Sequence, residues 1–322
     1  MRTINRNPGV HAPGDRMRSI YRGSPAAVPE VKGKTAFVVP WMGIAALDLA
    51  LETIGSKAWS PVNAYQKHWV QLFAKLRTVA AKFSDEELVR TWGKTAEEIN
   101  EFLAEHGFPE VKLDPFPSDG RSFGVASVLK VLMLWSVPGN PTKLEVGGHD
   151  AVQMKRGVSF HRTSSTDEFI VKIETKNGDE FFMVMEDEPL AGFDLWNRGV
   201  ALSKEALTPD REFNEVRFPM VSFDEFSPDA KQLVGLNTPD PDGKNVWDVV
   251  QVKEKVRFRM NEKGAKVEGA FAAEVRMRGM PAPPRVLEIN RPFIAWVNRP
   301  GLSAPIMVAR ICPEHWKNPG AL

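Results

Sequence analysis

The residues best suited to acid–base chemistry in this chain lie together in the stretch EVGGHDAV, where His149 and Asp150 follow two glycines. A histidine beside a carboxylate can transfer protons near neutral pH and can activate a nucleophile that lies close to it. No serine or cysteine near this stretch stands in a recognisable nucleophile motif. We therefore predict that Gly147 and Gly148 form a turn and that the stretch has no catalytic role.

The sequence lacks the usual patterns for holding a metal ion or a nucleotide. The stretch NTPDPDGKN at 237–245 looks like a calcium loop, but its glycine is misplaced for that spacing, so we predict a turn. The GxSxG elbow, the phosphate loop and the dinucleotide fingerprint are all absent. We predict no enzyme activity, no metal site and no cofactor. The histidines are scattered without metal-binding spacing, at His11, His68, His106, His149, His161 and His315.

Composition and charge narrow the class of protein further. The 42 basic and 41 acidic residues give a net charge of +1, which provides no overall field for nucleic acid or membrane. The single cysteine, Cys312, excludes an internal disulfide, and we expect it to be a buried apolar residue. The longest apolar run, 123–137, is too short to span a bilayer and is predicted to be a buried central strand.

The first 34 residues differ from the rest of the chain. They lack the apolar segment of a secretory signal, and Pro8, Gly9 and Pro13 disfavour a helix. We predict that residues 1–34 form an extended arm that binds a protein partner in a larger assembly. An organellar presequence or a solvated tail are the alternatives, so the compartment is left open. The first 23 residues of the arm carry five arginines against one acid: Arg2, Arg6, Arg16, Arg18 and Arg22.

Helical periodicity dominates the first third of the chain. Apolar spacing predicts one helix over 42–55 and a second over 64–83. Two capping boxes predict further helices over 84–92 and 95–107.

Strand patterns dominate after about residue 125. The stretches 168–176 and 180–185 flank Asn177-Gly178, which predicts a hairpin with a two-residue turn. The order of helices followed by strands predicts an α+β fold with large mixed or antiparallel sheets and helices mainly from the N-terminal half. We expect one domain over 35–322. Further strands are predicted within 214–226, 285–297 and 304–313.

The tetrapeptide NEKG at 261–264 separates two alternating patterns of opposite parity. Apolar residues before it fall on even numbers, as Val256 and Phe258 do, and the small or apolar residues of 265–275 fall on odd numbers. Such a switch is typical of an antiparallel hairpin. Because charges fill the positions between, residues 265–275 could enter a sheet without burying them.

The last third of the chain resembles the serpin family. The stretch LEINRPFIAWV is similar to the C-terminal signature of serpins, with Asn290, Arg291, Pro292 and Phe293 at matching positions. PIMVARICP resembles the last strand of the family, and looser similarities extend the resemblance over most of 35–322. The resemblance implies a serpin-like fold.

The resemblance also implies a reactive loop over about 262–284. In serpins this loop is offered to a serine protease and, after cleavage, inserts as a strand into the largest sheet. Counting from the hinge places the scissile bond after Arg278, which suits a trypsin-like protease, and counting back from Pro283-Pro284 places it after Met280, with Gly279 between. The implied hinge residues are Glu262, Gly264, Ala265, Val267 and Gly269.

Positions that match the serpin shutter, the cluster that keeps the main sheet closed but openable, depart from the family. Val39, Trp41 and Met42 occupy the serine-rich segment, Leu134 replaces the asparagine and Glu254 replaces the histidine. A hydrogen-bonded cluster is thus replaced by apolar residues and one carboxylate, which argues against an openable sheet.

These departures favour a non-inhibitory serpin-like protein that acts as a binding or structural component of a larger assembly. The alternative is a suicide inhibitor of a trypsin-like serine protease, cleaved after Arg278 or Met280, with insertion of 265–275 into the main sheet. An enzyme with an unrecognised site is a third hypothesis. The expected partners are proteins, with no specific nucleic-acid signal and no membrane span.

Overall fold

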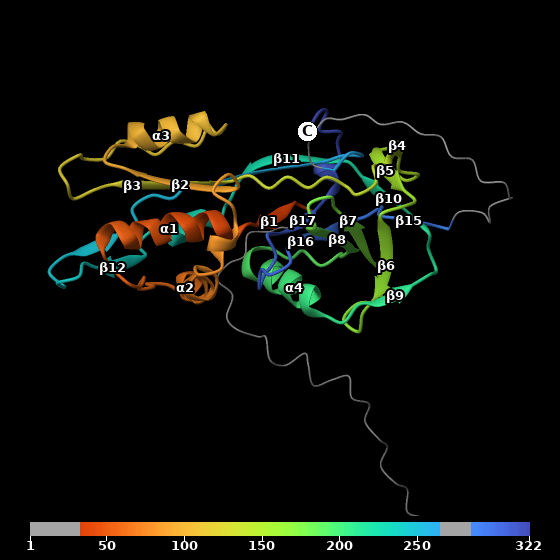
Figure 1. Cartoon of the computed structure of the whole chain (residues 1–322), viewed down its shortest axis with the longest axis horizontal. Coiled ribbons are helices and arrows are strands. Elements are labelled where there is room, and N and C mark those ends of the chain that lie inside the picture. Colours follow the sequence, from red (N-terminus) through yellow and green to blue (C-terminus); the bar gives the residue numbers. More distant parts are fainter. Residues whose placement is uncertain (1–32, 265–284) are drawn as a thin grey trace, which may run out of the picture.

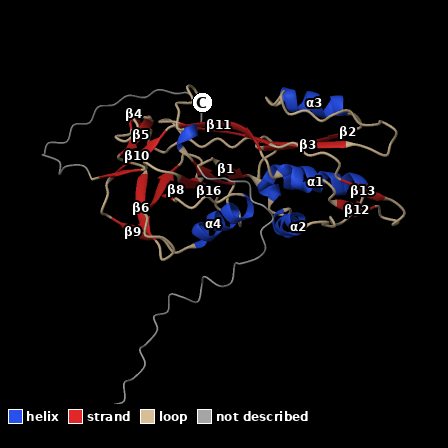
Figure 2. Ribbon diagram, turned by 180° about the vertical axis from the view of Figure 1, so that it is seen from behind, coloured by secondary structure: helices blue, strands red, loops and turns tan. Residues whose placement is uncertain are grey.

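Helices and large sheets gather toward opposite ends of the molecule. The computed structural model describes residues 33–264 and 285–322. The α-helices are α1 (Pro40–Ile54), α2 (Ala64–Leu76), α3 (Ala96–Glu105) and α4 (Gly192–Lys204), and the 3₁₀ turns are η1 (Ala80–Lys82), η2 (Ala230–Leu233) and η3 (Pro313–His315). The first three helices lie at one end, and α4 lies with the large sheets at the other (Figures 1 and 2). None of these helices is long and apolar enough to cross a membrane.

A seven-stranded antiparallel sheet forms the centre of the larger end. In order across the sheet the strands are β1 (Ala36–Val38), β17 (Met307–Ile311), β16 (Phe293–Asn298), β8 (Glu180–Met185), β7 (Ile170–Glu174), β6 (Val158–Arg162) and β9 (Thr208–Asp210). The predicted hairpin of β7 and β8 is confirmed, but its two-residue turn is not, because Glu174 pairs with Glu180 and this register leaves an odd number of residues in the connection. Gly178 lies in that connection with φ +84°. Helix α4 crosses β16, β17 and β1, and a Cβ at Gly199 would lie 2.5 Å from the Val308 side chain. Only glycine allows this close approach.

A four-stranded sheet packs beside the first. Its strands are β15 (Val286–Glu288), β10 (Glu215–Pro219), β5 (Asp150–Met154) and β4 (Asn140–Lys143), with β15 parallel to β10. The predicted single strand over 214–226 is in fact two, because the chain leaves this sheet at Met220 and continues in another sheet as β11 (Val221–Phe226).

Two antiparallel strand pairs are separate from both sheets. One pair is β2 (Leu88–Gly93) with β3 (Gly124–Leu129), and the other is β11 with β14 (Lys255–Met260). Helix α3 covers one side of the β2–β3 pair and α1 lies on the other (Figure 1). The short hairpin of β12 (Asn237–Pro239) and β13 (Val246–Asp248) closes the predicted turn at 237–245.

Several predicted elements change type or length. The helix over 84–92 is wrong, because residues from Leu88 onward pair with β3, although Glu87 N–H does donate to Ser84 Oγ at 3.3 Å. A local cap contributes only about 1 kcal/mol, and a six-residue strand pairing overrides it. The helix over 64–83 ends at Leu76, and the strand over 123–137 ends at Leu129. The α+β class and the helix within 95–107 are confirmed.

Candidate functional site: an apolar groove between two strand pairs

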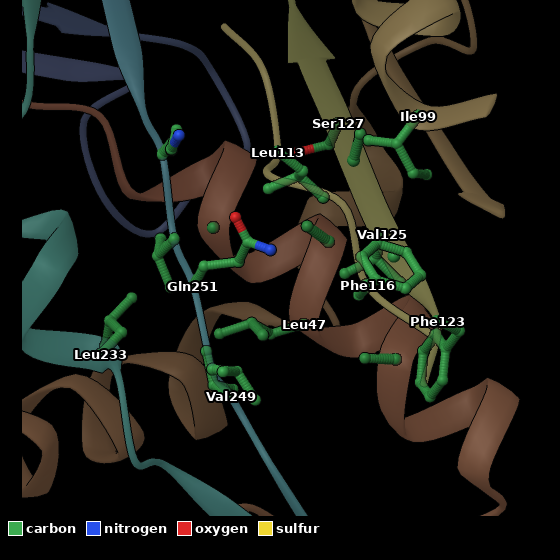
Figure 3. Close-up of a pocket in the computed structure, with 18 of the residues that line it drawn as sticks. Leu47, Ile99, Leu113, Phe116, Phe123, Val125, Ser127, Leu233, Val249 and Gln251 are labelled. Atoms are coloured by element: carbon green, nitrogen blue, oxygen red, sulfur yellow. The ribbon is translucent and has the colours of Figure 1, made fainter. Parts of the chain in front are cut away.

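A cavity of about 610 Å³ lies between β3 and the segment 246–255 that leads into β14 (Figure 3). Over residues 124–129, no backbone hydrogen bond joins β3 to β14 in the part of the chain that the structure describes. The two strand pairs, β2–β3 and β11–β14, are therefore not joined into one sheet along this stretch. We call the space between them the groove.

Small side chains on α1 leave room at the floor of the groove. Gly43, Ala46 and Ala50 line it at helical spacing, beside Leu47. On the β3 wall, Ser127 Oγ donates to the Met42 carbonyl at 2.6 Å, which fixes this strand to α1. The alternate β3 residues turn the other way, toward α3, where Ala126 and Val128 join a separate apolar cluster.

A segment that follows α3 crosses the mouth of the groove, and we call residues 107–117 the strap. Asn100 of α3 holds Leu113 by two hydrogen bonds, one from the Leu113 N–H at 2.8 Å and one to its carbonyl at 3.1 Å. Gln251 does the same for Asp114, at 2.9 and 3.0 Å. The side chains of Leu113 and Phe116 line the groove (Figure 3).

Ion pairs connect the strap to β14 and to the residues just before it. Glu110 pairs with Lys255 at 2.8 Å and with Arg257, and Asp114 pairs with Lys253 at 3.2 Å. The hydrogen bond from Lys255 is the main reason why the pKa of Glu110 falls to about 2. Arg257 also lies over the Phe108 ring, 4.6 Å from its centroid. The strap thus links α3 to β14 across the groove.

Glu254 lies on the inner wall of the groove, on the strand face opposite the ion-paired lysines. Burial raises the pKa of its carboxyl to about 7, with a further contribution from Asp229, while a hydrogen bond from Ser227 partly offsets this. Burial raises the pKa of Asp229 as well, and burial and both carboxylates raise the pKa of Tyr65. Among the described residues, neither Glu254 nor Asp229 forms an ion pair with a lysine, arginine or histidine.

The start of the implied hinge packs against the segment that follows β3. The Gly139 N–H donates to the Glu262 carbonyl at 2.8 Å, and the Trp135 indole N–H donates to the Asn261 carbonyl at 2.9 Å. Gly264 has φ +111°, and a Cβ there would lie 2.5 Å from the Met133 carbonyl oxygen, so this position requires glycine. The remaining hinge and loop residues, Ala265, Val267, Gly269, Arg278, Gly279 and Met280, lie outside the described residues.

The positions that match the shutter fall into two places. Trp41 is fully buried and donates to the Pro305 carbonyl at 2.9 Å, and Met42 lines the groove together with Glu254. Leu134 lies instead at the hinge, where it pairs with Gly264. The structure therefore brings Met42 and Glu254 to one site.

The signature residues at 290–293 connect the two larger sheets. Phe293 is fully buried in β16, and the Pro292 carbonyl accepts a hydrogen bond from the Glu186 N–H at 2.9 Å. Arg291 pairs with Glu168 at 2.6 Å and with Asp187 at 2.5 Å, whereas Asn290 is exposed between β15 and β16. These contacts are those of a structural connection.

Other sequence candidates lie away from the groove. His149 closes the turn predicted at 147–148, and its ring meets Trp316 edge-on with the centroids 5.3 Å apart. Cys312 is fully buried, as predicted, and burial raises the pKa of its thiol to about 11. The arginines of the arm, Arg2, Arg6, Arg16, Arg18 and Arg22, lie outside the described residues.

Sequence analysis missed the groove and the strap. The small residues at every third or fourth position of α1 were one available signal. Another was the alternation over 252–257, in which basic residues occupy one face and Glu254 the other. Neither signal identifies the groove by itself, because its lining comes from many separate segments of the chain.

Solved structures of known proteins identify the fold. No family model and no curated protein sequence matches the chain. The structure is similar to a serpin from Schistosoma mansoni, with 13% identity, 86% of this chain and 95% of that chain covered, and a TM-score of 0.54. A serpin from Schistosoma haematobium gives 14% identity, coverage of 88% and 95%, and a TM-score of 0.53. A thyroxine-binding globulin in complex with thyroxine gives 12% identity, coverage of 87% and 92%, and a TM-score of 0.50.

The two schistosome serpins are matched over 88% and 86% of this chain and over 95% of their own lengths. The expectation drawn from the signature at 287–297 is confirmed at the level of the fold. This chain has the serpin fold, in a form whose sequence has diverged far from the solved examples.

Proposed function

We propose that this chain is a serpin-fold protein that does not trap proteases and that acts as a binding or structural component of a larger protein assembly. The observation that carries this proposal is the strap. Because β14 ends directly before the hinge, an inserting strand would lie beside β14 and not in the seven-stranded sheet, so trapping would place residues 265–275 between β3 and β14. That space lies beneath residues 107–117 and contains the side chains of Leu113 and Phe116. An inserting strand would have to displace them.

Displacing the strap has a cost that slows insertion. The two hydrogen bonds between Gln251 and the Asp114 backbone contribute about 1 kcal/mol each. The ion pairs of Glu110 and Asp114 also have to break. If insertion is slow, water hydrolyses the ester that joins the protease to the loop, and the active protease is released. Clean cleavage is therefore the expected outcome of an encounter with a protease.

The wall of the groove adds a second obstacle. A strand inserted beside β14 would cover Glu254 more completely, and burying an unpaired carboxylate is unfavourable. The serpin fold is also compatible with a binding role, since the thyroxine-binding globulin of the same fold is found in complex with thyroxine.

The arm supplies the proposed contact with the assembly. Its five arginines can each form paired hydrogen bonds with carboxylates of a protein partner. Deleting residues 2–22 should abolish co-purification of the partner and leave the Tm unchanged. Co-purification that survives the deletion would count against this contact.

One observation favours the alternative, a suicide inhibitor of a trypsin-like protease cleaved after Arg278 or Met280. Within the described residues, the facing edges of β3 and β14 are not hydrogen-bonded to each other along the groove, and unpaired edges accept an added strand.

Incubation with trypsin separates the two functions. We expect cleavage without a covalent complex on a denaturing gel, and a Tm that is the same before and after cleavage. A complex that resists SDS, or a large rise in Tm after cleavage, would establish the inhibitor and overturn our proposal. An active-site-blocked trypsin serves as the control, because it can bind the loop but cannot be acylated.

A further inference from the structure

The groove has the dimensions and lining of a small-molecule site. Its volume of about 610 Å³ falls within the range of ligand pockets, roughly 300–1,000 Å³. Most of its lining is apolar, from α1, β3, the strap and the segment 246–255. Figure 3 shows Leu47, Val125 and Phe116 around one open space, with the Gln251 amide at its edge.

The groove is lined by several charged residues, and their pairing separates Glu254 from the rest. Arg121 pairs with Asp119, and Asp248 is exposed at the rim. Glu254 lines the inner wall, and Asp229, which lies outside the groove, adds a second negative charge near it. The neighbouring lysines on the same strand, Lys253 and Lys255, are engaged on the opposite face by Asp114 and by Glu110 with Asp224. Within the described part of the chain, no basic side chain compensates Glu254.

A ligand that complements this site must have an apolar body and one positive charge. The apolar body would fill the space above the small residues of α1. The positive charge would pair with the Glu254 carboxylate, which is otherwise buried without a cation. We propose that the groove binds an organic amine, with its ammonium group paired to the Glu254 carboxylate and its apolar body against α1 and β3. Binding of an amine at this site requires neither protease trapping nor the arm, although a bound amine would occupy the space that an inserted strand would take.

The amine site has a defined dependence on pH. The groups that face Glu254 are Tyr65 of α2, Asp229 before η2 and Ser227 after β11. The ammonium group of an aliphatic amine stays protonated through neutral pH, so the titrating partner is the carboxyl group. Affinity for the amine rises as Glu254 ionises between pH 6 and pH 8.

Two probes of matched shape test the proposal. The full chain is titrated calorimetrically at pH 8 with 2-(1-naphthyl)ethylamine and with 2-(1-naphthyl)ethanol, which has the same apolar body and no charge. We expect the amine to bind at least about tenfold more tightly than the alcohol. Between pH 8 and pH 6 the affinity for the amine should fall, and that for the alcohol should stay constant.

Three variants test whether the probes bind in the groove and beside Glu254. Glu254→Gln should reduce the preference for the amine to less than about twofold, whereas Asp248→Asn, which removes an exposed acid at the rim of the same groove, should keep it. Ala46→Leu fills the floor and should weaken both probes, with the Tm of each variant checking its folding. The proposal is overturned if neither probe binds, if both bind equally, or if the preference survives Glu254→Gln.

Discussion

Glu254 is a buried acid whose ionisation opposes folding. Its pKa of about 7 in the folded chain lies above the ordinary value of 4.5 that we take for the unfolded chain. Below pH 4.5 the carboxyl is protonated in both states, and the stability difference is zero. As the pH rises to about 7 and beyond, the folded state must hold an unpaired carboxylate, so the free energy of unfolding falls by about 1–3 kcal/mol.

We therefore expect Glu254→Gln to raise the free energy of unfolding by about 1–3 kcal/mol at pH 8 and to leave it nearly unchanged at pH 4.5. Urea denaturation at the two pH values measures this difference. Glu101→Gln is the matched control, because Glu101 is an exposed residue of α3 that forms no ion pair with the described residues. Equal effects of Glu254→Gln at both pH values would show that the carboxyl is not held in its neutral form.

Gly264 is a second residue whose identity follows from its surroundings. Alanine at this position would combine an unfavourable φ with a methyl group 2.5 Å from the Met133 carbonyl. We expect Gly264→Ala to lower the free energy of unfolding by about 2–3 kcal/mol in chemical denaturation. Gly243→Ala is the control, since φ is +70° there but no atom lies within 4 Å of the added Cβ. Its cost should stay near 1 kcal/mol; similar losses in both variants would mean that the contact with Met133 contributes nothing.

The strap is an element held by side chains, and this makes its attachment testable. Gln251→Ala removes both hydrogen bonds to the Asp114 backbone without touching the strap itself. We expect trypsin to cut after the exposed Lys112 about five- to tenfold faster in this variant, since the strap opens more often. The rate is measured by mass spectrometry of the fragment that begins at Leu113.

Gln232→Ala, which changes a glutamine away from the strap, should leave cleavage after Lys112 unchanged. An unchanged rate in Gln251→Ala would mean that the ion pairs of Glu110 hold the strap by themselves. Adding Glu110→Gln to that variant would then produce the acceleration.

Local sequence patterns predicted those elements whose stability is local. Thr95 caps α3 by accepting from the Glu98 N–H, and Asn177 and Gly178 lie in the β7–β8 connection, which is longer than the predicted two-residue turn. The prediction of a helix over 84–92 is wrong although its capping residues are present. The residues that follow the cap pair with β3, from Leu88 with Leu129 to Gly93 with Gly124. A capping box describes the start of a helix and carries no information about a distant strand.

The fold of the molecule was predictable from the order of motifs, chiefly the signature around Arg291 and the hairpin pattern before it. The groove was not, because it arises where strands do not pair. Its walls come from α1, the strap, β3 and the segment 246–255, and a gap between segments so far apart leaves no periodicity in any one of them. Glu254 could be singled out in the sequence only as a departure from the family, and its lack of a cation required the structure.

The apolar cluster beneath α3 is separate from the main core. Ile99, Leu103, Val111, Ala126 and Val128 pack with one another and not with the residues around Trp296. Helix α3 and the strap can therefore unfold as one cooperative unit while the seven-stranded sheet stays intact. In native-state hydrogen exchange we expect amides of α3 to exchange with a lower free energy of opening than those of β16. Amides of α3 that exchange only with global unfolding would instead show that the two clusters melt together.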